Sequence, residues 1–287
     1  MAPKLTLIGA GHVFRIEQTI RGAIQALRPD VVFVELDMGR LQALMERAKG
    51  NKPPVSGGFV HRRLAAFQEG VAGMYGADPG SEMLAAVQGA RDVGARLALI
   101  DDPAEATLRR AIREITWREK ARAFGLVAGS GLRSLWPPSR GKAKAQIETE
   151  LSRYQKDPQA VLDEVKRKFP TIHRVLIAER DAKMAARIRE AFTAGAAPGG
   201  ASGVGGAGAA GVRGPGGAPI RHGVAVLGDG HVGGMSDLLA DLKPTVFRLA
   251  AVREGRLPKP GPVATGTSVS VGFTVVWPGT ARPPPQS

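Results

Sequence analysis

The chain has 287 residues, of which 43% are hydrophobic, enough to bury a substantial core in one large domain or two small ones. Its 40 Lys and Arg outnumber its 26 Asp and Glu. The basic residues are spread over several predicted helices and only 5% of residues are aromatic, so the formal charge of +14 indicates nonspecific attraction to acidic partners and no specific nucleic-acid binding. The absence of cysteine excludes disulfides, thiolate metal ligands and a cysteine nucleophile.

The first predicted element is a buried strand, Leu5 to Ile8, which runs into Gly9-Ala10-Gly11 and then His12. Gly-x-Gly allows positive φ and close backbone approach, so such a turn delivers an imidazole to the tip of the strand. The same design returns at Val224 to His231. A single copy suits a capping or packing histidine equally well, but two matching copies make both histidines candidate functional residues.

A strand-helix-strand unit follows the first histidine. Residues 15–28 carry an apolar stripe at spacings of four, four and three, which predicts an amphipathic helix. Val31 to Asp37 predicts a strand buried on both faces and interrupted near its end by Glu35. A connection of this length favours a parallel pair with a right-handed crossover, so His12 and Glu35 should lie at the same edge of the sheet.

The next part predicts short helices around Leu41 to Met45 and around Arg63 to Glu69. Ser81 is a good N-cap for a further helix. That helix leads to a third parallel strand, Arg96 to Ile100, which ends in Asp101-Asp102.

The middle of the chain is mainly helical. After Pro103 the chain shows an apolar helical stripe formed by Leu108, Ile112 and Ile115. We interpret the basic residues around this stripe as a solvated face. Residues 124–141 predict either a lid or a loop-rich connection, and a polar helical region broken near Asp157-Pro158 follows.

Thr171 to Phe192 is the most regular helix candidate. Its periodicity places Asp181 on the stripe that faces the core, where an unpaired charge costs several kcal/mol. The charged triplet Glu179, Arg180 and Asp181 must therefore be solvated, paired or near a ligand.

The C-terminal third begins with residues 195–219, almost wholly Gly, Ala, Pro, Ser and Val, which predict a disordered, flexible insertion. After the second histidine motif we expect a short helix at Asp237 to Leu242 and strands at Thr245 to Val252 and Ser268 to Trp277. Residues 278–287 form a loose Pro-rich tail. The whole pattern predicts a single α/β domain over residues 1–277, with a central, mostly parallel sheet flanked by helices.

The N-terminus leads directly into a strand, without the charged and apolar regions of a secretory signal. No apolar run approaches the ~20 residues that span a bilayer. We therefore expect no transmembrane span and a cytoplasmic location.

Four predicted strands end in polar side chains: His12, Glu35 with Asp37, Asp101 with Asp102, and His231. Ligands of open α/β sheets bind beyond the carboxyl ends of the strands, so these side chains can converge on one site. Two imidazoles and one or two carboxylates can hold a divalent ion that polarises a carbonyl and generates hydroxide near neutral pH. A spare glutamate would move the proton.

Other sites fit less well. Gly9-Ala10-Gly11 lacks the third glycine of a dinucleotide fingerprint, and no Walker lysine follows it. Neither a GxSxG elbow nor an HExxH motif is present.

Several segments between about residues 5 and 240 occur together in one known family. They are Leu-Ile-Gly-Ala-Gly-His-Val (7–13), Pro-Asp-Val-Val-Phe-Val-Glu-Leu-Asp (29–37) with Arg40-Leu41, Gly-Ser-Glu-Met (80–83), Leu-Ile-Asp-Asp (99–102) with Thr107 to Arg110, Glu-Arg-Asp (179–181) with Met184-Ala185, and Gly-Asp-Gly-His-Val (228–232). In these segments the sequence resembles the TraB/PrgY family and the wider superfamily that contains the GumN and TIKI proteins.

This resemblance implies an α/β fold and a site built from His12, His231 and Glu35. TIKI proteins are metal-dependent peptidases that use such histidines and acids with manganese or cobalt, and TraB and PrgY are associated with shutdown of a peptide pheromone. Other recurring polar residues of the family match Glu82, Arg109 and the triplet 179–181. The chain departs from the family in having Leu-Ile-Asp-Asp for Leu-Ile-Asp-Arg, and in lacking the C-terminal hydrophobic spans of many TraB proteins.

Our leading hypothesis is a metal-dependent hydrolase of peptides. His12, Glu35 and His231 would bind a divalent ion, Mn or Co in preference to Zn, with Glu179, Arg180 and Asp181 as catalytic residues and Glu179 or Asp181 as a further ligand or proton carrier. The rival hypothesis is a regulatory protein that sequesters a peptide or small ligand without cleaving it, and a third makes both histidines structural caps. The expected partner is a peptide or small-molecule substrate, with homo-oligomerisation left open.

Overall fold

The computed structural model describes residues 3–11, 16–51, 80–133, 149, 158–194, 220–259 and 275–276. His12, the predicted helix at 63–69, most of the predicted strand at 268–277, the insertion 195–219 and the tail 278–287 lie outside the described residues.

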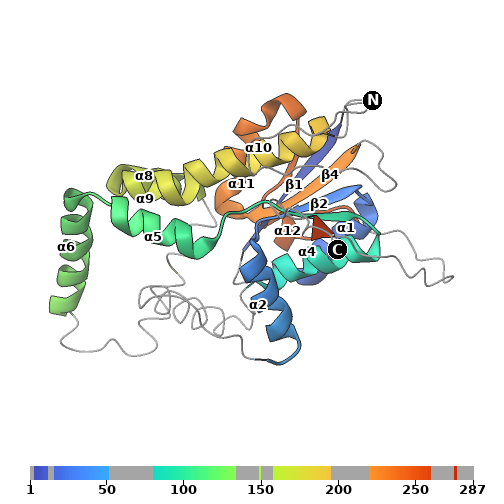
Figure 1. The fold of residues 1–287 in the computed structure, drawn as a ribbon. Helices are drawn as coiled ribbons and strands as arrows, with labels where there is room; N and C mark the ends of the chain where they lie inside the picture. Colours follow the sequence, from blue (N-terminus) through green and yellow to red (C-terminus); the bar gives the residue numbers. More distant parts are fainter. Residues whose placement is uncertain are drawn as a thin grey trace, which may run out of the picture.

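A parallel sheet forms the centre of the fold (Figure 1). Its strands are β1 (Lys4–Ala10), β2 (Val31–Val34), β3 (Arg96–Leu99), β4 (His222–Gly228), β5 (Thr245–Phe247) and β6 (Val275–Val276). Their order is β5-β1-β4-β2-β3-β6, and every described pair is parallel. The α/β class with a central parallel sheet is thus confirmed.

The position of β4 matters most for the site. This strand lies between β1 and β2, with Ala10 opposite Gly228 and Val34 opposite Val226. The end of the second glycine-histidine motif therefore lies beside the end of β1 on one side and beside Glu35 on the other.

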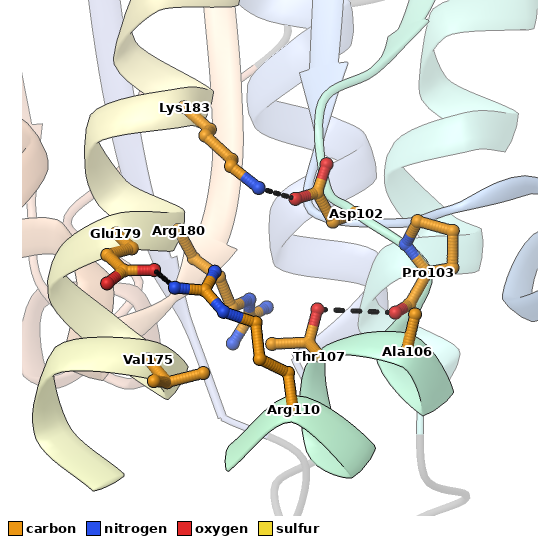
Figure 2. A pocket seen from close by; sticks show the side chains of 9 residues that line it. All are labelled: Asp102, Pro103, Ala106, Thr107, Arg110, Val175, Glu179, Arg180 and Lys183. Carbon is orange, nitrogen blue, oxygen red and sulfur yellow. Dashed lines mark hydrogen bonds and ion pairs between the residues drawn. The ribbon is translucent and has the colours of Figure 1, made fainter. Parts of the chain in front are cut away.

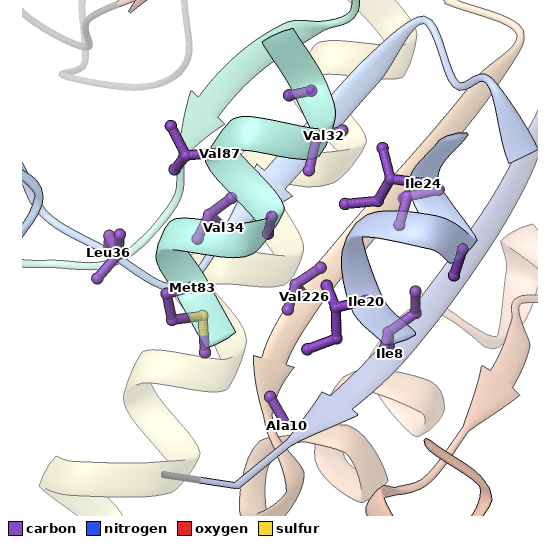
Figure 3. Packing of buried hydrophobic residues seen from close by; sticks show 14 of the residues in the cluster. Ile8, Ala10, Ile20, Ile24, Val32, Val34, Leu36, Met83, Val87 and Val226 are labelled. Atoms are coloured by element: carbon purple, nitrogen blue, oxygen red, sulfur yellow. The ribbon is translucent and has the colours of Figure 1, made fainter. Parts of the chain in front are cut away.

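Helices cover both faces of the sheet. Helices α1 (Glu17–Leu27), α4 (Ser81–Asp92) and α12 (Leu249–Arg253) pack on one face, where Ile20 and Ile24 of the predicted stripe are fully buried against strand residues such as Val226 (Figure 3). Helices α10 (Glu179–Ala194) and α11 (Asp229–Leu238) pack on the other face through a second core cluster. Burial on both faces explains why the strands are nearly continuous apolar runs.

The remaining helices lie at the periphery (Figure 1). They are α2 (Met38–Ala48), α5 (Ala104–Glu114), α6 (Trp117–Arg133), α8 (Pro158–Lys168) and α9 (Pro170–His173). The predicted stripe of α5 does not lie in the core, because Ile112 is exposed and only Ala111 of this helix is buried. Nowhere in the described ranges does a helix combine the length and the hydropathy that crossing a membrane requires.

Two predicted element boundaries are wrong. The strand expected at 245–252 ends at Phe247, because the N–H of Leu249 donates to Asp229 Oδ1 at 2.8 Å and the chain turns there into α12. Ser81 is not an N-cap. Gly80, whose φ of +87° favours glycine, precedes α4, and Ser81 Oγ donates to Glu17 Oε1 at 2.6 Å.

The structure also changes the interpretation of the second histidine motif. Gly228 has a φ of −57°, and α11 begins at Asp229, eight residues before the helix predicted at 237–242. His231 is therefore in the first turn of a helix and not on a glycine turn. The residues predicted as a helix instead form the end of α11 and a 3-10 turn, Ala240–Leu242.

Candidate functional site

Charged side chains from four elements meet at the carboxyl edge of the sheet. Glu35 follows β2, Asp101 lies just beyond β3, and His231 is in the first turn of α11 after β4. Arg180 and Asp181, in the first turn of α10, complete the group. The expectation that the strand ends at Glu35, Asp101 and His231 converge is confirmed, and Asp181 faces inward as its helical position predicted. We call these five residues the acid–histidine cluster.

Arg180 is the hub of this cluster. Its Nη2 donates to Glu35 Oε1 and to Asp101 Oδ2, both at 2.6 Å, and its Nε donates to Asp101 Oδ1 at 2.9 Å. Its Nη1 lies 3.1 Å from His231 Nε2 and donates to the Leu176 carbonyl at 3.0 Å. Charge-assisted bonds of this kind raise the pKa of Arg180, although burial lowers it. The guanidinium is thus a fixed positive charge that joins three elements.

Asp181 holds the other side of the imidazole. Its Oδ1 lies 2.6 Å from His231 Nδ1, and both side chains are nearly buried. Burial raises the pKa of Asp181 above its ordinary value, and the bond to His231 opposes this shift. The pKa of His231 is also raised: burial lowers it, but the nearby carboxylates of Glu35 and Asp181 outweigh burial. The carboxylate fixes the orientation of the ring.

Glu35 remains ionised in this environment. Burial alone would raise its pKa, but His231, Arg180 and the N–H of Gly228, which donates to Oε2 at 2.7 Å, together lower it to about 2. Its other oxygen, Oε1, lies 3.3 Å from His231 Nε2. The carboxylate oxygen of Glu35 and the imidazole nitrogen of His231 are therefore close enough to contact the same bound atom.

The neighbouring acids Asp37 and Asp102 support the site from outside the cluster. Asp37 caps α2 by accepting from the N–H of Arg40 at 3.0 Å. Asp102 pairs with Lys183 at 2.5 Å and with Arg187 at 2.7 Å. Neither carboxylate contacts His231, although the sequence had grouped both with the candidate ligands.

Glu179 turns away from the cluster. It pairs with Arg110 and Arg174, each at 2.6 Å, and lines a pocket of about 310 Å³ between α5 and α10. Arg180 and Lys183 line the same pocket (Figure 2). Glu179 is therefore beside the site, and Arg180 lies between the pocket and the cluster.

The two further family-matched residues lie elsewhere. Glu82 is buried in the first turn of α4. Arg109 is exposed on α5 and pairs with Glu105 at 3.1 Å. Neither is part of the acid–histidine cluster.

Two glycines allow side chains to pack closely at this edge of the sheet, and the sequence singled out only one of them, Gly9. A Cβ on Gly9 would overlap Asp229 Oδ1, and a Cβ on Gly234 would overlap Asp181 Oδ2. Gly234 was missed by sequence reasoning, although its position three residues after His231 on one helix was the available signal. Gly9 of the first motif thus serves close approach, as predicted, and it does so without positive φ.

A divalent ion fits the donors of this cluster in part. Ligand bonds to such ions are about 2.0–2.2 Å long, so two donor atoms 3.3 Å apart, Glu35 Oε1 and His231 Nε2, can share one ion. The bond from His231 Nδ1 to Asp181 is the outer support that metal-binding histidines ordinarily have. Within the described ranges no group of three or more His, Asp or Glu forms a ligand set, and the third predicted ligand, His12, lies outside them.

Comparisons with known proteins agree with the motifs. The model of the TraB/PrgY/gumN family matches residues 2–245. An uncharacterized protein of Methanocaldococcus jannaschii is 30% identical over 195 residues, which are 64% of this chain and 46% of that relative. The matched region thus spans about half the length of the relative. No solved structure matches the chain.

Proposed function

The chain belongs to the TraB/PrgY/gumN family, and from this premise we propose that it is a metal-dependent hydrolase of peptide bonds. We assign a divalent ion to His231, Glu35 and His12, and, following the resemblance to TIKI proteins, Mn or Co in preference to Zn. The ion would polarise the substrate carbonyl and lower the pKa of a bound water.

One observation carries the proposal. Glu35 Oε1 and His231 Nε2 are 3.3 Å apart, while His231 Nδ1 is held by buried Asp181 at 2.6 Å. The carboxylate of Glu35 is ionised at neutral pH because its pKa is about 2. An anionic oxygen and an oriented imidazole at one point are the donors that a divalent ion of intermediate softness prefers.

The other charged residues receive distinct roles. Asp181 orients His231 and is the better placed of the two candidate proton carriers, since Glu179 is engaged with Arg110 and Arg174. The pocket of about 310 Å³ beside the cluster is the space we assign to part of the peptide. Its lining carries charges of both signs, including Lys183 and Glu179, which suits a polar substrate.

Metal analysis of protein purified without a histidine tag tests the proposal. We expect Mn or Co to copurify or to bind on addition, and hydrolysis of a peptide library to depend on the ion. Glu35→Gln should abolish the hydrolysis, while Glu105→Gln, which removes an exposed ion pair on α5, should leave it intact. If Mn, Co and Zn are all absent and none restores cleavage, the hydrolase proposal is wrong.

A non-catalytic binding protein is the second candidate, and Arg180 favours it. Its guanidinium pairs with both Glu35 and Asp101 and contacts His231. Arg40 Nη1 is a second cation beside Asp101, 3.3 Å from Oδ2, so both carboxylates have cationic partners without an ion. Such a protein would sequester a peptide in the adjacent pocket. Mass spectrometry would then find the peptide intact after incubation with the wild type and with Glu35→Ala, and the substitution would change only the affinity.

A further inference from the structure

We propose that Arg180 is a built-in competitor for the metal ion, which occupies the cation position between Glu35 and His231 and must withdraw when a divalent ion binds. This inference rests on the proposed metal-dependent function and adds a regulatory property to it. It follows from which atoms Arg180 contacts, from its charge and from the space beside it.

The contacted atoms are the two proposed donors themselves. Arg180 Nη2 lies 2.6 Å from Glu35 Oε1, and Nη1 lies 3.1 Å from His231 Nε2. A hydrogen bond to the imidazole nitrogen uses the same lone pair as a metal–ligand bond. An ion and the guanidinium therefore cannot occupy these atoms at the same time.

Charge makes the competition strong. A guanidinium does not lose its proton in a protein, so Arg180 stays a cation between Glu35 and Asp101. Two cations a few ångströms apart in a nearly buried site repel each other with little screening. Arg180 must move away from the donors before the ion enters.

The surroundings offer Arg180 a second position. Its Nε and Nη2 are anchored on Asp101, which also accepts from the N–H of Asp102 at 2.8 Å. The side chain lines the pocket of about 310 Å³ beside the cluster (Figure 2). A side-chain rotation that keeps the bond from Nε to Asp101 Oδ1 would withdraw Nη2 from Glu35 and Nη1 from His231, and would leave the guanidinium paired with Asp101. In the metal-free protein Arg180 remains paired with Glu35, and because the ion must displace it, metal binding is weaker.

Isothermal titration of metal-free protein with Mn²⁺, without a histidine tag, tests this competition. Arg180→Met keeps an unbranched apolar stem and removes the guanidinium with its charge, and should bind Mn²⁺ roughly tenfold more tightly or better. The same variant should melt at a lower temperature without metal, because Glu35 and Asp101 both lose the ion pair with Arg180. Mn²⁺ should raise its melting temperature more than that of the wild type. Arg180→Lys, which keeps the charge, should resemble the wild type in affinity and replaces Arg180→Met if that variant does not fold.

Lys183→Met is the matched control. Lys183 lies three residues further along α10, lines the same pocket and pairs with Asp102, but contacts neither proposed donor. Its removal should leave the Mn²⁺ affinity unchanged.

Three results overturn the inference, and the first two separate it from the proposed function. If the wild type binds Mn²⁺ and Arg180→Met binds it equally or more weakly, Arg180 does not compete, although the metal site stands. If neither protein binds Mn²⁺, Co²⁺ or Zn²⁺, the metal site and the competition are both wrong. If only Arg180→Lys folds, this variant should bind Mn²⁺ as the wild type does, because it keeps the positive charge. An Mn²⁺ affinity about tenfold above that of the wild type would then contradict a competition based on charge.

Discussion

His231 shows how single atoms decide what this cluster can do. Its Nε2 lies 3.1 Å from Arg180, which can only donate, and its Nδ1 lies 2.6 Å from Asp181, so the neutral ring fits these two contacts with its proton on Nδ1. The same tautomer presents a lone pair at Nε2 to a metal ion. Asp181 therefore orients the imidazole so that Nε2 can accept either the Arg180 guanidinium or a metal ion. A change at Asp181 should affect metal binding although Asp181 is not itself a proposed ligand.

Replacement of Asp181 by Asn tests this role. An amide group cannot stabilise the Nδ1–H tautomer as a carboxylate does, so we expect Asp181→Asn to weaken Mn²⁺ binding roughly 10- to 100-fold. Glu179→Gln, two residues earlier on the same helix, removes an acid whose described ion pairs are with Arg110 and Arg174, and should leave the affinity unchanged. Equal losses in both variants, measured by titration calorimetry, would mean a general charge effect.

Gly234 gives a second prediction at this scale, with an unusual sign. Gly→Ala inside a helix ordinarily stabilises a protein by up to about 1 kcal/mol. At Gly234 the new methyl group would overlap Asp181 Oδ2, so Gly234→Ala should instead destabilise by about 1–3 kcal/mol. Gly125→Ala, at an open position of α6, should stabilise. Urea unfolding measures both, and a stabilised Gly234→Ala would show that Asp181 has room to move.

At the scale of elements, the start of α10 explains why Arg180 and Asp181 reach the sheet edge. A π turn, Arg174–Ala178, separates α9 from α10. Such turns shift the helical register, and they often occur at functional sites. Here the Leu176 carbonyl accepts from Arg180 Nη1 at 3.0 Å, so the turn helps to position the hub residue. The regular periodicity of 171–192 predicted one helix and gave no sign of the turn.

The beginning of α6 is held by a capping box that also anchors α9. Glu119 Oε2 accepts from the N–H of Thr116 at 3.0 Å, the N–H of Glu119 donates to Thr116 Oγ1 at 3.3 Å, and Glu119 Oε1 accepts from the N–H of Thr171 at 2.7 Å. Burial alone would raise the pKa of Glu119, but these hydrogen bonds lower it from 4.5 to about 2. One side chain therefore links two helices and adds a pH dependence to their contact.

The sign of that pH dependence follows from the lowered pKa. Because the pKa of Glu119 is lower in the folded state, its carboxylate stabilises the fold above about pH 4.5, and this contribution is lost as the pH falls toward 2. Glu119→Gln should cost about 1 kcal/mol at neutral pH and progressively less in acid. Unfolding by urea at several pH values measures the difference, with Glu105→Gln as an exposed control. A deficit that does not change between neutral pH and acid would contradict this role.

At the scale of the whole molecule, the sheet order could not be predicted from the sequence. Apolar runs such as Val31 to Val34 identified the strands, and parallel topology placed Glu35, Asp101 and His231 at one edge. Nothing in the local pattern shows that β4 lies between β1 and β2, because that order depends on packing between segments about 200 residues apart. The central place of Arg180 is a tertiary effect of the same kind, since its own helix shows only a charged residue beside a buried one.

The two glycine-histidine motifs also meet through a residue that the sequence analysis left without a role. Asp229 of the second motif lies against Gly9 of the first, and accepts from the N–H of Leu249 and from Arg248. It thereby joins β1, α11 and α12 around the edge that carries the cluster. The second motif thus supplies Asp229 to the packing between β1, α11 and α12, which we call the frame, and His231 to the acid–histidine cluster.

Replacement of Asp229 by Ala tests whether this residue stabilises the fold without taking part in metal binding. Its side chain is 3% exposed, and it accepts from Arg248 Nη2 at 3.0 Å as well as from the backbone, so its loss leaves the Leu249 N–H buried without its acceptor. We expect Asp229→Ala to destabilise the protein by about 3 kcal/mol, the lower end for a broken buried pair because Arg248 is partly exposed. Asp241→Ala removes an exposed ion pair with Arg189 and should cost at most about 1 kcal/mol in the same urea titration.

Metal binding decides what the result for Asp229→Ala means. If Asp229 belongs to the frame, the folded fraction of the variant should bind Mn²⁺ with the affinity of the wild type, because none of the described contacts of Asp229 reaches Glu35 or His231. A variant that unfolds at the same urea concentration as the wild type but has lost Mn²⁺ would place Asp229 in the metal site itself. In the first case the variant loses stability and keeps its Mn²⁺ affinity, and in the second it keeps its stability and loses its Mn²⁺ affinity. Measuring both quantities on this one variant therefore distinguishes a packing role from a metal-binding role.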